Sequence, residues 1–253
     1  MKKNTNYGYP LSFILMKFVI FLFLTIGMFL LFIIGLNLYF VIILSIIVFI
    51  LYTQFCIINF KKYFLKNRNK LLKRIIKLAD LKGNETVLDL GTGSGFLAIG
   101  FAKNLKKGRS YGLDRYNIKY NSLKKRLIRN IKINFVGNSL KNALENAKIE
   151  NVEKKCEFIQ ADLTKPIDFS DKKFDIIVSS QFFYCLSHRI RPIVFKEINR
   201  LLKKGGKIIF FESSNFMSWD LNEGKKYFES NGYKIQIIPI KEFKNCSILY
   251  GQK

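Results

Sequence analysis

The chain has 253 residues, of which 43 are Lys or Arg and 18 are Asp or Glu, so its formal net charge is +25. Such a charge raises the question of nucleic-acid binding, but no segment interleaves aromatic and basic side chains as an RNA-binding module does, so nucleic acid is discounted as a partner. The 4 cysteines lie far apart without a Cys-x-x-Cys pair, and His188 is the single histidine; this argues against a metal site and favours reduced thiols.

The segment from residue 11 to residue 60 is almost continuously apolar, with Lys17 as its one charge. It is too long for one membrane span of about 20 residues, and Gly35 to Leu38 contains its only polar interruption. The pattern predicts two transmembrane helices, near 14–34 and 38–59, that form an N-terminal membrane anchor over residues 1–60. The alternatives are a cleaved signal peptide, whose apolar region would be shorter, and a buried soluble hairpin.

Basic residues flank this segment on both sides, at Lys2 and Lys3 and then throughout 61–77. Because positive charge stays on the cytoplasmic side, the expected protein is an integral, multi-pass membrane protein with both termini, and the domain over 61–253 that follows the anchor, cytoplasmic. The basic run also has an apolar stripe, so we expect a helix that either packs on the following domain or contacts anionic lipid headgroups of the bilayer. The stripe consists of Leu71, Leu72, Ile75 and Ile76.

A buried strand at Val87–Leu90 then runs into a glycine-rich turn and a helix. Alternating glycines allow a tight reversal and let a ligand approach the backbone. The spacing differs from the dinucleotide pattern G-x-G-x-x-G, and an acid two residues before the first glycine would repel a pyrophosphate but suits an ammonium group. The alternatives to a ligand with an ammonium group are that the turn binds a different nucleotide or that it has a purely structural role. The candidate cofactor-binding residues here are Asp89, Gly91, Thr92, Gly93, Ser94, Gly95 and Phe96.

This turn resembles the first motif of class I S-adenosyl-L-methionine-dependent methyltransferases, and the resemblance continues to residue 253. A second strand, Ser110–Leu113, ends at Asp114 and Arg115, where an acid about 20 residues past the glycine motif binds a ribose. A third strand, 156–160, precedes Asp162 and Leu163; the family places its third acid there, near the adenine amino group. The alternatives are a solvated acid at Asp114 and a helix N-cap at Asp162.

The fourth strand, 174–180, is continuously apolar as in a buried parallel sheet, and Ser179 near its end is a further cofactor candidate. A fifth strand follows at 208–211, and strands at 234–240 and 246–250 correspond to the antiparallel edge hairpin of the family. The sequence therefore predicts an α/β fold: a Rossmann-like, doubly wound, seven-stranded sheet, mostly parallel with a C-terminal antiparallel hairpin, preceded by the transmembrane hairpin.

The segment between Asp114 and Asp162 is longer than one crossover helix requires. Its second half, 138–151, predicts that helix, with Ser139 as cap and Leu140, Leu144 and Ala147 facing inward. Its first half, near 116–136, predicts a basic amphipathic insertion within the 61–253 methyltransferase domain. Such a helix either lies in a membrane interface or covers the sheet.

The segment after the fourth strand faces the methyl group in this fold. Gln181, Phe182 and Tyr184 are the candidate substrate residues, and Tyr184 or His188 could act as a base if the acceptor must lose a proton; ordinary packing or surface roles are the alternatives. No Asn-Pro-Pro-Tyr is present, which argues against amino-group methylation of adenine or glutamine.

The predicted protein is thus a membrane-anchored S-adenosyl-L-methionine-dependent methyltransferase that acts on a lipophilic small-molecule acceptor. The alternatives are a protein or peptide methyltransferase at the membrane and a non-catalytic membrane-tethered scaffold that retains the fold.

Overall fold

The computed structural model describes residues 5, 7, 21, 22, 25–27, 29, 33, 38–60, 66–116, 139–213, 220–243 and 245–253. The chain divides into two compact units, one made of Met1–Gly8 and Leu72–Lys253 and the other of Tyr9–Leu71. Most of the predicted helix near 14–34 lies outside the described residues, and so does the predicted insertion near 116–136 apart from Tyr116.

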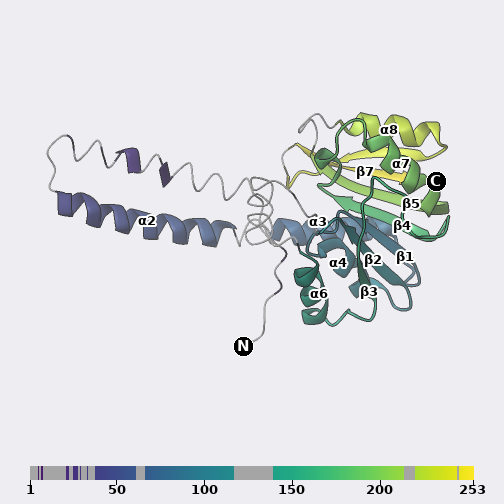
Figure 1. The fold of residues 1–253 in the computed structure, drawn as a ribbon, viewed down its shortest axis with the longest axis horizontal. Helices are drawn as coiled ribbons and strands as arrows, with labels where there is room; N and C mark the ends of the chain where they lie inside the picture. The colour runs from purple at the N-terminus through teal and green to yellow at the C-terminus, as the bar shows by residue number, and fades with distance from the viewer. Residues whose placement is uncertain are drawn as a thin grey trace. The chain divides into compact units, whose positions relative to one another are not determined.

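The helix expected near 38–59 forms as α2 (Leu38–Phe60), the long helix in Figure 1. Within the part of the chain that the structure describes, however, no helix has the combined length and apolar character that crossing a bilayer requires. The predicted transmembrane helices are therefore not supported, and the predicted multi-pass, integral membrane localisation is wrong.

The basic run forms α3 (Lys66–Ala79), and of its apolar stripe Leu71 and Ile75 are buried while Leu72 and Ile76 are partly buried. From Leu72 onward this helix packs on the α/β unit. A Cβ added at Gly100 would overlap the side chain of Leu72, and Ile75 is completely buried. The Nζ of Lys207 donates a hydrogen bond of 2.8 Å to the carbonyl of Ala79 at the end of the helix. Of the two expectations for the stripe, packing on the domain is the one that the structure confirms.

The α/β unit contains a seven-stranded sheet with the strand order β3-β2-β1-β4-β5-β7-β6. The first five strands are parallel, and β7 pairs antiparallel with both β5 and β6, which confirms the predicted sheet and its C-terminal hairpin. β5 begins earlier than expected because Leu202 already pairs with Phe174 of β4. The strands are β1 (Thr86–Leu90), β2 (Arg109–Asp114), β3 (Cys156–Gln160), β4 (Phe174–Ser180), β5 (Leu202–Ser213), β6 (Lys234–Pro239) and β7 (Cys246–Gln252).

Helices cover the sheet in two layers (Figure 1). α4 (Phe96–Asn104) and α6 (Leu140–Ile149) pack over β1, β2 and β3, whereas α7 (Arg191–Leu201) and α8 (Leu221–Ser230) share the other core with the aliphatic side chains of β1, β4 and β5. Because successive strand residues point to opposite faces, Leu88 and Leu90 enter the α7 and α8 core. Asp89, between them, faces α4, and its carboxylate accepts the N–H of Ala98.

The cap of α6 was predicted correctly, and its inward face only in part. The Ser139 hydroxyl accepts the N–H of Asn142, as expected of an N-cap. Leu144, however, is 52% exposed, and the buried face instead consists of Ala143, Asn146 and Ala147. Small side chains let α6 approach α4 closely, and Asn146 donates a hydrogen bond of 3.0 Å to the carbonyl of Ser94 in the glycine-rich turn. That polar contact determines which face of the helix turns inward.

The burial of Leu88 and the exposure of Leu144 predict opposite outcomes for the same substitution. Leu88→Ala should lower the free energy of unfolding by about 2–5 kcal/mol, because it leaves a cavity in a packed core. Leu144→Ala should change it by less than about 0.5 kcal/mol. Urea denaturation of both variants measures the difference, and an equal loss in the two would contradict the assigned packing of α6.

Candidate functional site

The glycine-rich turn lies where the strand order of the sheet reverses. β1 pairs with β2 on one side and with β4 on the other, so the crossover connections diverge at the carboxyl ends of β1 and β4. In open α/β sheets, ligands bind at such a point. Gly91, Gly93 and Gly95 have positive φ values of 66°, 55° and 87°, a backbone conformation that favours glycine over residues with a Cβ.

Asp89 ties the turn to the helix that follows it. Its Oδ2 accepts hydrogen bonds from the Thr92 hydroxyl at 2.6 Å and from the Ala98 N–H at 3.1 Å, and the residue is 2% exposed. The N–H of Thr92 donates to the carbonyl of Leu113 in β2 at 2.9 Å. The turn is therefore held at both ends by buried hydrogen bonds, so its backbone is organised before any ligand binds.

Asp114, at the end of β2, lies beside the same turn, since its Oδ2 accepts the N–H of Gly93 at 2.8 Å. Burial raises the pKa of this carboxyl, although the backbone N–H groups of Gly93, Arg115 and Tyr116 act in the opposite direction. The structure thus brings together the two acids and the glycines that the sequence predicted as cofactor-binding residues.

The third predicted acid is held at the end of β3. Partial burial would raise the pKa of Asp162, but hydrogen bonds from Thr164 and the nearby Arg115 lower it below its usual value. A guanidinium nitrogen of Arg115 lies 3.2 Å from Oδ2 of Asp162, so these two predicted residues form an ion pair between the ends of β2 and β3. Leu163 is buried against the core. Asp162 closes a local turn by accepting the Thr164 N–H and hydroxyl, and no helix begins there.

Aromatic side chains pack against the glycines. A Cβ at Gly91 would overlap the ring of Phe182, and one at Gly95 would lie 2.7 Å from Cζ of Phe158. Phe96, the first residue of α4, contacts the ring of Tyr7 edge-on, with centroids 5.4 Å apart. Tyr7 belongs to the same compact unit, and no sequence signal pointed to it. Glycine at 91 is therefore required by both its positive φ and the close approach of Phe182.

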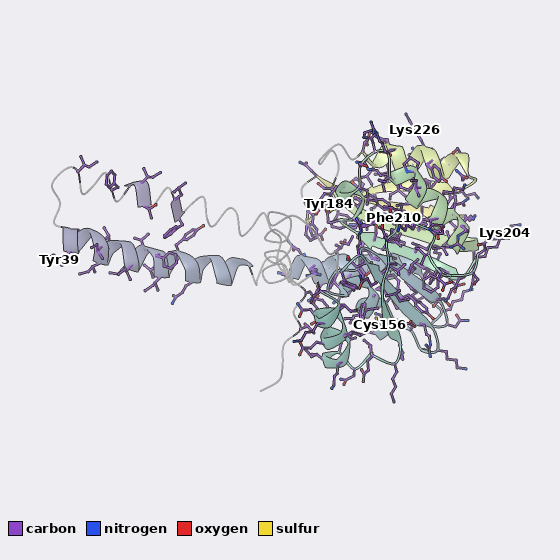
Figure 2. All side chains as sticks on the ribbon, viewed as in Figure 1. Tyr39, Cys156, Tyr184, Lys204, Phe210 and Lys226 are labelled. Atoms are coloured by element: carbon purple, nitrogen blue, oxygen red, sulfur yellow. The ribbon has the colours of Figure 1, made fainter. Side chains whose placement is uncertain are left out.

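The turn after β4 carries the predicted substrate and catalytic residues. Gln181 has a φ of 56°, and a short 3-10 helix, η2 (Phe183–Cys185), follows. Burial is the main cause that raises the pKa of Tyr184 above its usual value, and the neighbouring Cys185 is the second. Figure 2 shows Tyr184 at the end of the sheet opposite to Lys204, which lies near the start of β5. His188 is exposed on the segment that leads into α7.

Glu212, near the end of β5, is a site residue that sequence reasoning missed. Its side chain is completely buried beneath the turn after β4, and its Oε1 accepts the N–H of Phe182 at 2.9 Å. Ser179, a predicted cofactor residue, is also completely buried, with its hydroxyl 3.4 Å from the same oxygen. The sequence contains one signal that could have identified Glu212: it is an acid that directly follows the apolar strand residues Ile208–Phe211.

These residues match the chemistry of the predicted cofactor. The ammonium group and ribose hydroxyls of that cofactor need carboxylate acceptors, and Asp89 and Asp114 are carboxylates that lie at the turn. Its approach needs backbone without side chains, and three glycines follow Asp89 there. A metal ion would need a different arrangement. Among the described residues, no group of three or more His, Cys, Asp or Glu is placed to hold one.

A family model described as "Methyltransferase domain" matches residues 81–232, which is more than half of the chain. The chain belongs to the methyltransferase domain family. This confirms the predicted enzyme class, an S-adenosyl-L-methionine-dependent methyltransferase, and its cofactor, S-adenosyl-L-methionine. The predicted anchor with N-terminal membrane helices is not supported.

Among characterised relatives, the methyltransferase domain is 35% identical over 165 residues to the ribosomal protein L11 methyltransferase of Dictyoglomus thermophilum, covering 64% of this chain and 42% of that protein. It is 25% identical over 201 residues to the release factor glutamine methyltransferase of Flavobacterium psychrophilum, covering 72% of this chain and 60% of that protein. The chain spans about half the length of these relatives.

Solved structures show the same fold. A SAM dependent methyltransferase from Aquifex aeolicus superimposes with a TM-score of 0.55 at 20% identity, covering 72% of this chain and 88% of that one. The ribosomal protein L11 methylase from Lactobacillus delbrueckii subsp. bulgaricus superimposes with a TM-score of 0.51 at 21% identity, covering 72% of this chain and 76% of that one.

Asp89→Ala should abolish measurable binding of S-adenosylhomocysteine and lower the free energy of unfolding by about 1–3 kcal/mol, because the Thr92 hydroxyl and the Ala98 N–H lose their buried acceptor. Isothermal calorimetry measures the binding. Asp171→Ala is the matched control, since Asp171 is 69% exposed and pairs with Arg200. Unchanged binding in Asp89→Ala would refute the assigned role of Asp89.

Glu212 should make the folded protein less stable as the pH rises. Burial raises the pKa of Glu212 from 4.5 to about 8, against the N–H groups of Phe182 and Phe183, which lower it. The stability that comes from its protonated form is complete below the unfolded pKa and is lost as the pH rises through the folded pKa. The Tm of the wild type should therefore fall relative to that of Glu212→Gln between about pH 5 and about pH 9. Calorimetric scans of both proteins measure this, and a constant difference in Tm would contradict it.

Proposed function

We propose that this methyltransferase domain transfers the methyl group of S-adenosyl-L-methionine to a protein acceptor at the carboxyl edge of the sheet. The observation that carries the proposal is the 35% identity to a relative named for methylating ribosomal protein L11. A second relative is named for methylating a release factor. A protein acceptor is the alternative that the sequence analysis set beside a lipophilic one.

The lipophilic acceptor has lost its main support. It was preferred because a membrane anchor would hold the site at the lipid surface, and no described helix meets the requirements for such an anchor. The edge at the end of η2 and just beyond it suits a large acceptor instead, because the exposed residues there are Cys185, Ser187, His188 and Arg189. An extended polypeptide could approach the turn after β4 along this exposed segment.

Some residues of the chain would hold the cofactor, and others would orient the acceptor. We infer that Asp89, Asp114 and Asp162, together with the turn from Gly91 to Phe96, hold the cofactor; Arg115, Leu163 and Ser179 support them. When bound, the cofactor supplies an electrophilic methyl group. The protein then has to align the acceptor with it, and alignment alone can supply much of a rate enhancement.

The acceptor side of the site is the turn after β4. We infer that Gln181 and Phe182 line it and that Tyr184 contributes a hydrogen-bond donor, because a phenol is protonated at neutral pH and burial raises the pKa of this one further. An amino acceptor that arrives as its ammonium form must give up a proton to a base before its nitrogen lone pair can attack the methyl group. His188 is the candidate base, since its side chain is exposed to an approaching acceptor and imidazole is the most frequent general base in enzymes.

The 253-residue chain, incubated with tritiated S-adenosyl-L-methionine and a bacterial lysate, should transfer label to acid-precipitated protein. The pellet and a chloroform extract of the same reaction are counted separately. Asp89→Ala serves as the control that lacks the cofactor contact. Label confined to the lipid extract would overturn the protein acceptor, and label in neither fraction above that control would favour the non-catalytic scaffold.

A further inference from the structure

Glu212 lies beneath the turn after β4 and bonds to its backbone. Its Oε1 accepts the N–H groups of Phe182 at 2.9 Å and of Phe183 at 3.3 Å, and its residue is completely buried. Among the described residues, its Oε2 has no hydrogen-bond partner. Burial of a carboxyl group costs free energy unless its hydrogen bonds compensate. The burial of Glu212 therefore indicates a role beyond packing.

The local backbone explains why two N–H groups meet at one oxygen. The backbone of Gln181 has a left-handed conformation, with a φ of 56°, and that of Phe182 has a right-handed helical conformation, with φ −108° and ψ −47°. Consecutive residues of opposite hand form a nest, in which successive N–H groups converge on an anionic or carbonyl oxygen. The N–H of Gln181 donates to the carbonyl of Phe211 at 2.8 Å, which keeps the nest above the end of β5.

The same turn reaches the cofactor loop through a side chain. The ring of Phe182 lies so close to Gly91 that a Cβ there would overlap it. The next ring, Phe183, is completely buried and packs on Phe210 and Phe195, with centroids 4.9 and 5.5 Å away. Phe183 thus anchors the turn in the core, while Phe182 extends to the glycine-rich turn.

We propose that Glu212 is a positioning residue that holds the ring of Phe182 against Gly91, and so joins the acceptor turn to the cofactor loop as one rigid unit. This rests on the proposed function, because Gly91 matters here as part of the cofactor loop. Glu212 does not touch the cofactor or the acceptor. It acts through the backbone N–H groups of Phe182 and Phe183, so it needs an acceptor oxygen at that point rather than a negative charge.

Removing the oxygen should therefore weaken cofactor binding, and restoring it should restore binding. Glu212→Ala should raise the Kd of S-adenosylhomocysteine about tenfold, the scale of one lost hydrogen bond to a carboxyl group. Glu212→Gln keeps an oxygen acceptor in place and should stay within about twofold of the wild type. If Glu212→Ala does not fold, Glu212→Asp withdraws the oxygen by one methylene and should show the same loss. Calorimetry on the full-length chain measures each Kd.

A double-mutant cycle separates positioning from general destabilisation. Phe182→Ala should itself weaken binding, and Glu212→Ala in that background should add less than about twofold, since the ring through which Glu212 acts is gone. Glu197→Ala is the matched control. The Oε1 of Glu197 accepts the N–H of Ile167 in a hydrogen bond of 2.9 Å, and this hydrogen bond lies outside the proposed site. It should lower the Tm and leave the Kd unchanged.

The outcomes distinguish the two proposals. A wild type that fails to bind S-adenosylhomocysteine overturns the cofactor assignment itself. A wild type that binds, together with a Glu212→Ala variant of equal or tighter affinity, overturns the positioning role alone. Additive losses in the double mutant also overturn it, because Glu212 would then act independently of Phe182.

Discussion

The site depends on one buried carboxylate at the point where β1 ends. Asp89 accepts the Thr92 hydroxyl and the Ala98 N–H with the same oxygen, so it bridges the glycine-rich turn and the first turn of α4. The reversal between them requires three residues with positive φ, an arrangement with little intrinsic stability. The hydrogen bonds of Asp89 and the bond from Thr92 to β2 compensate for it, and the contacts of Asp114 with Gly93 and of Phe182 with Gly91 are made to the backbone that they hold.

Carboxyl groups concentrate at this edge of a strongly basic protein. The chain carries a net charge of +25, yet Asp89, Asp114, Asp162 and Glu212 all lie at or near the carboxyl ends of parallel strands. Backbone N–H groups, rather than lysines, stabilise three of them. Asp89 and Asp114, the two at the glycine-rich turn, are thus held by backbone N–H groups, which agrees with their proposed role as acceptors for a cationic, hydroxyl-bearing ligand.

The local pattern predicted the sheet well and the inward faces of its helices less well. Strands such as Phe174–Ser180 have apolar side chains on both faces, so their place in a buried parallel sheet follows from composition. A helix such as α6 has several plausible inward faces. Asn146 selects one of them by bonding to Ser94, a residue distant in the sequence, and Leu144 is consequently exposed.

The sequence by itself determined the strand order along the chain, the glycine turn and the acids at strand ends, because each follows from local spacing and side-chain type. Only the tertiary structure decided which groups act on one another. The ring of Phe182 against Gly91, and the nest over Glu212, depend on the φ of Gln181 and on the register of β4 with β5. A residue such as Gln181 gives no sign in sequence of a left-handed conformation, since packing around it, rather than its own preference, imposes that conformation.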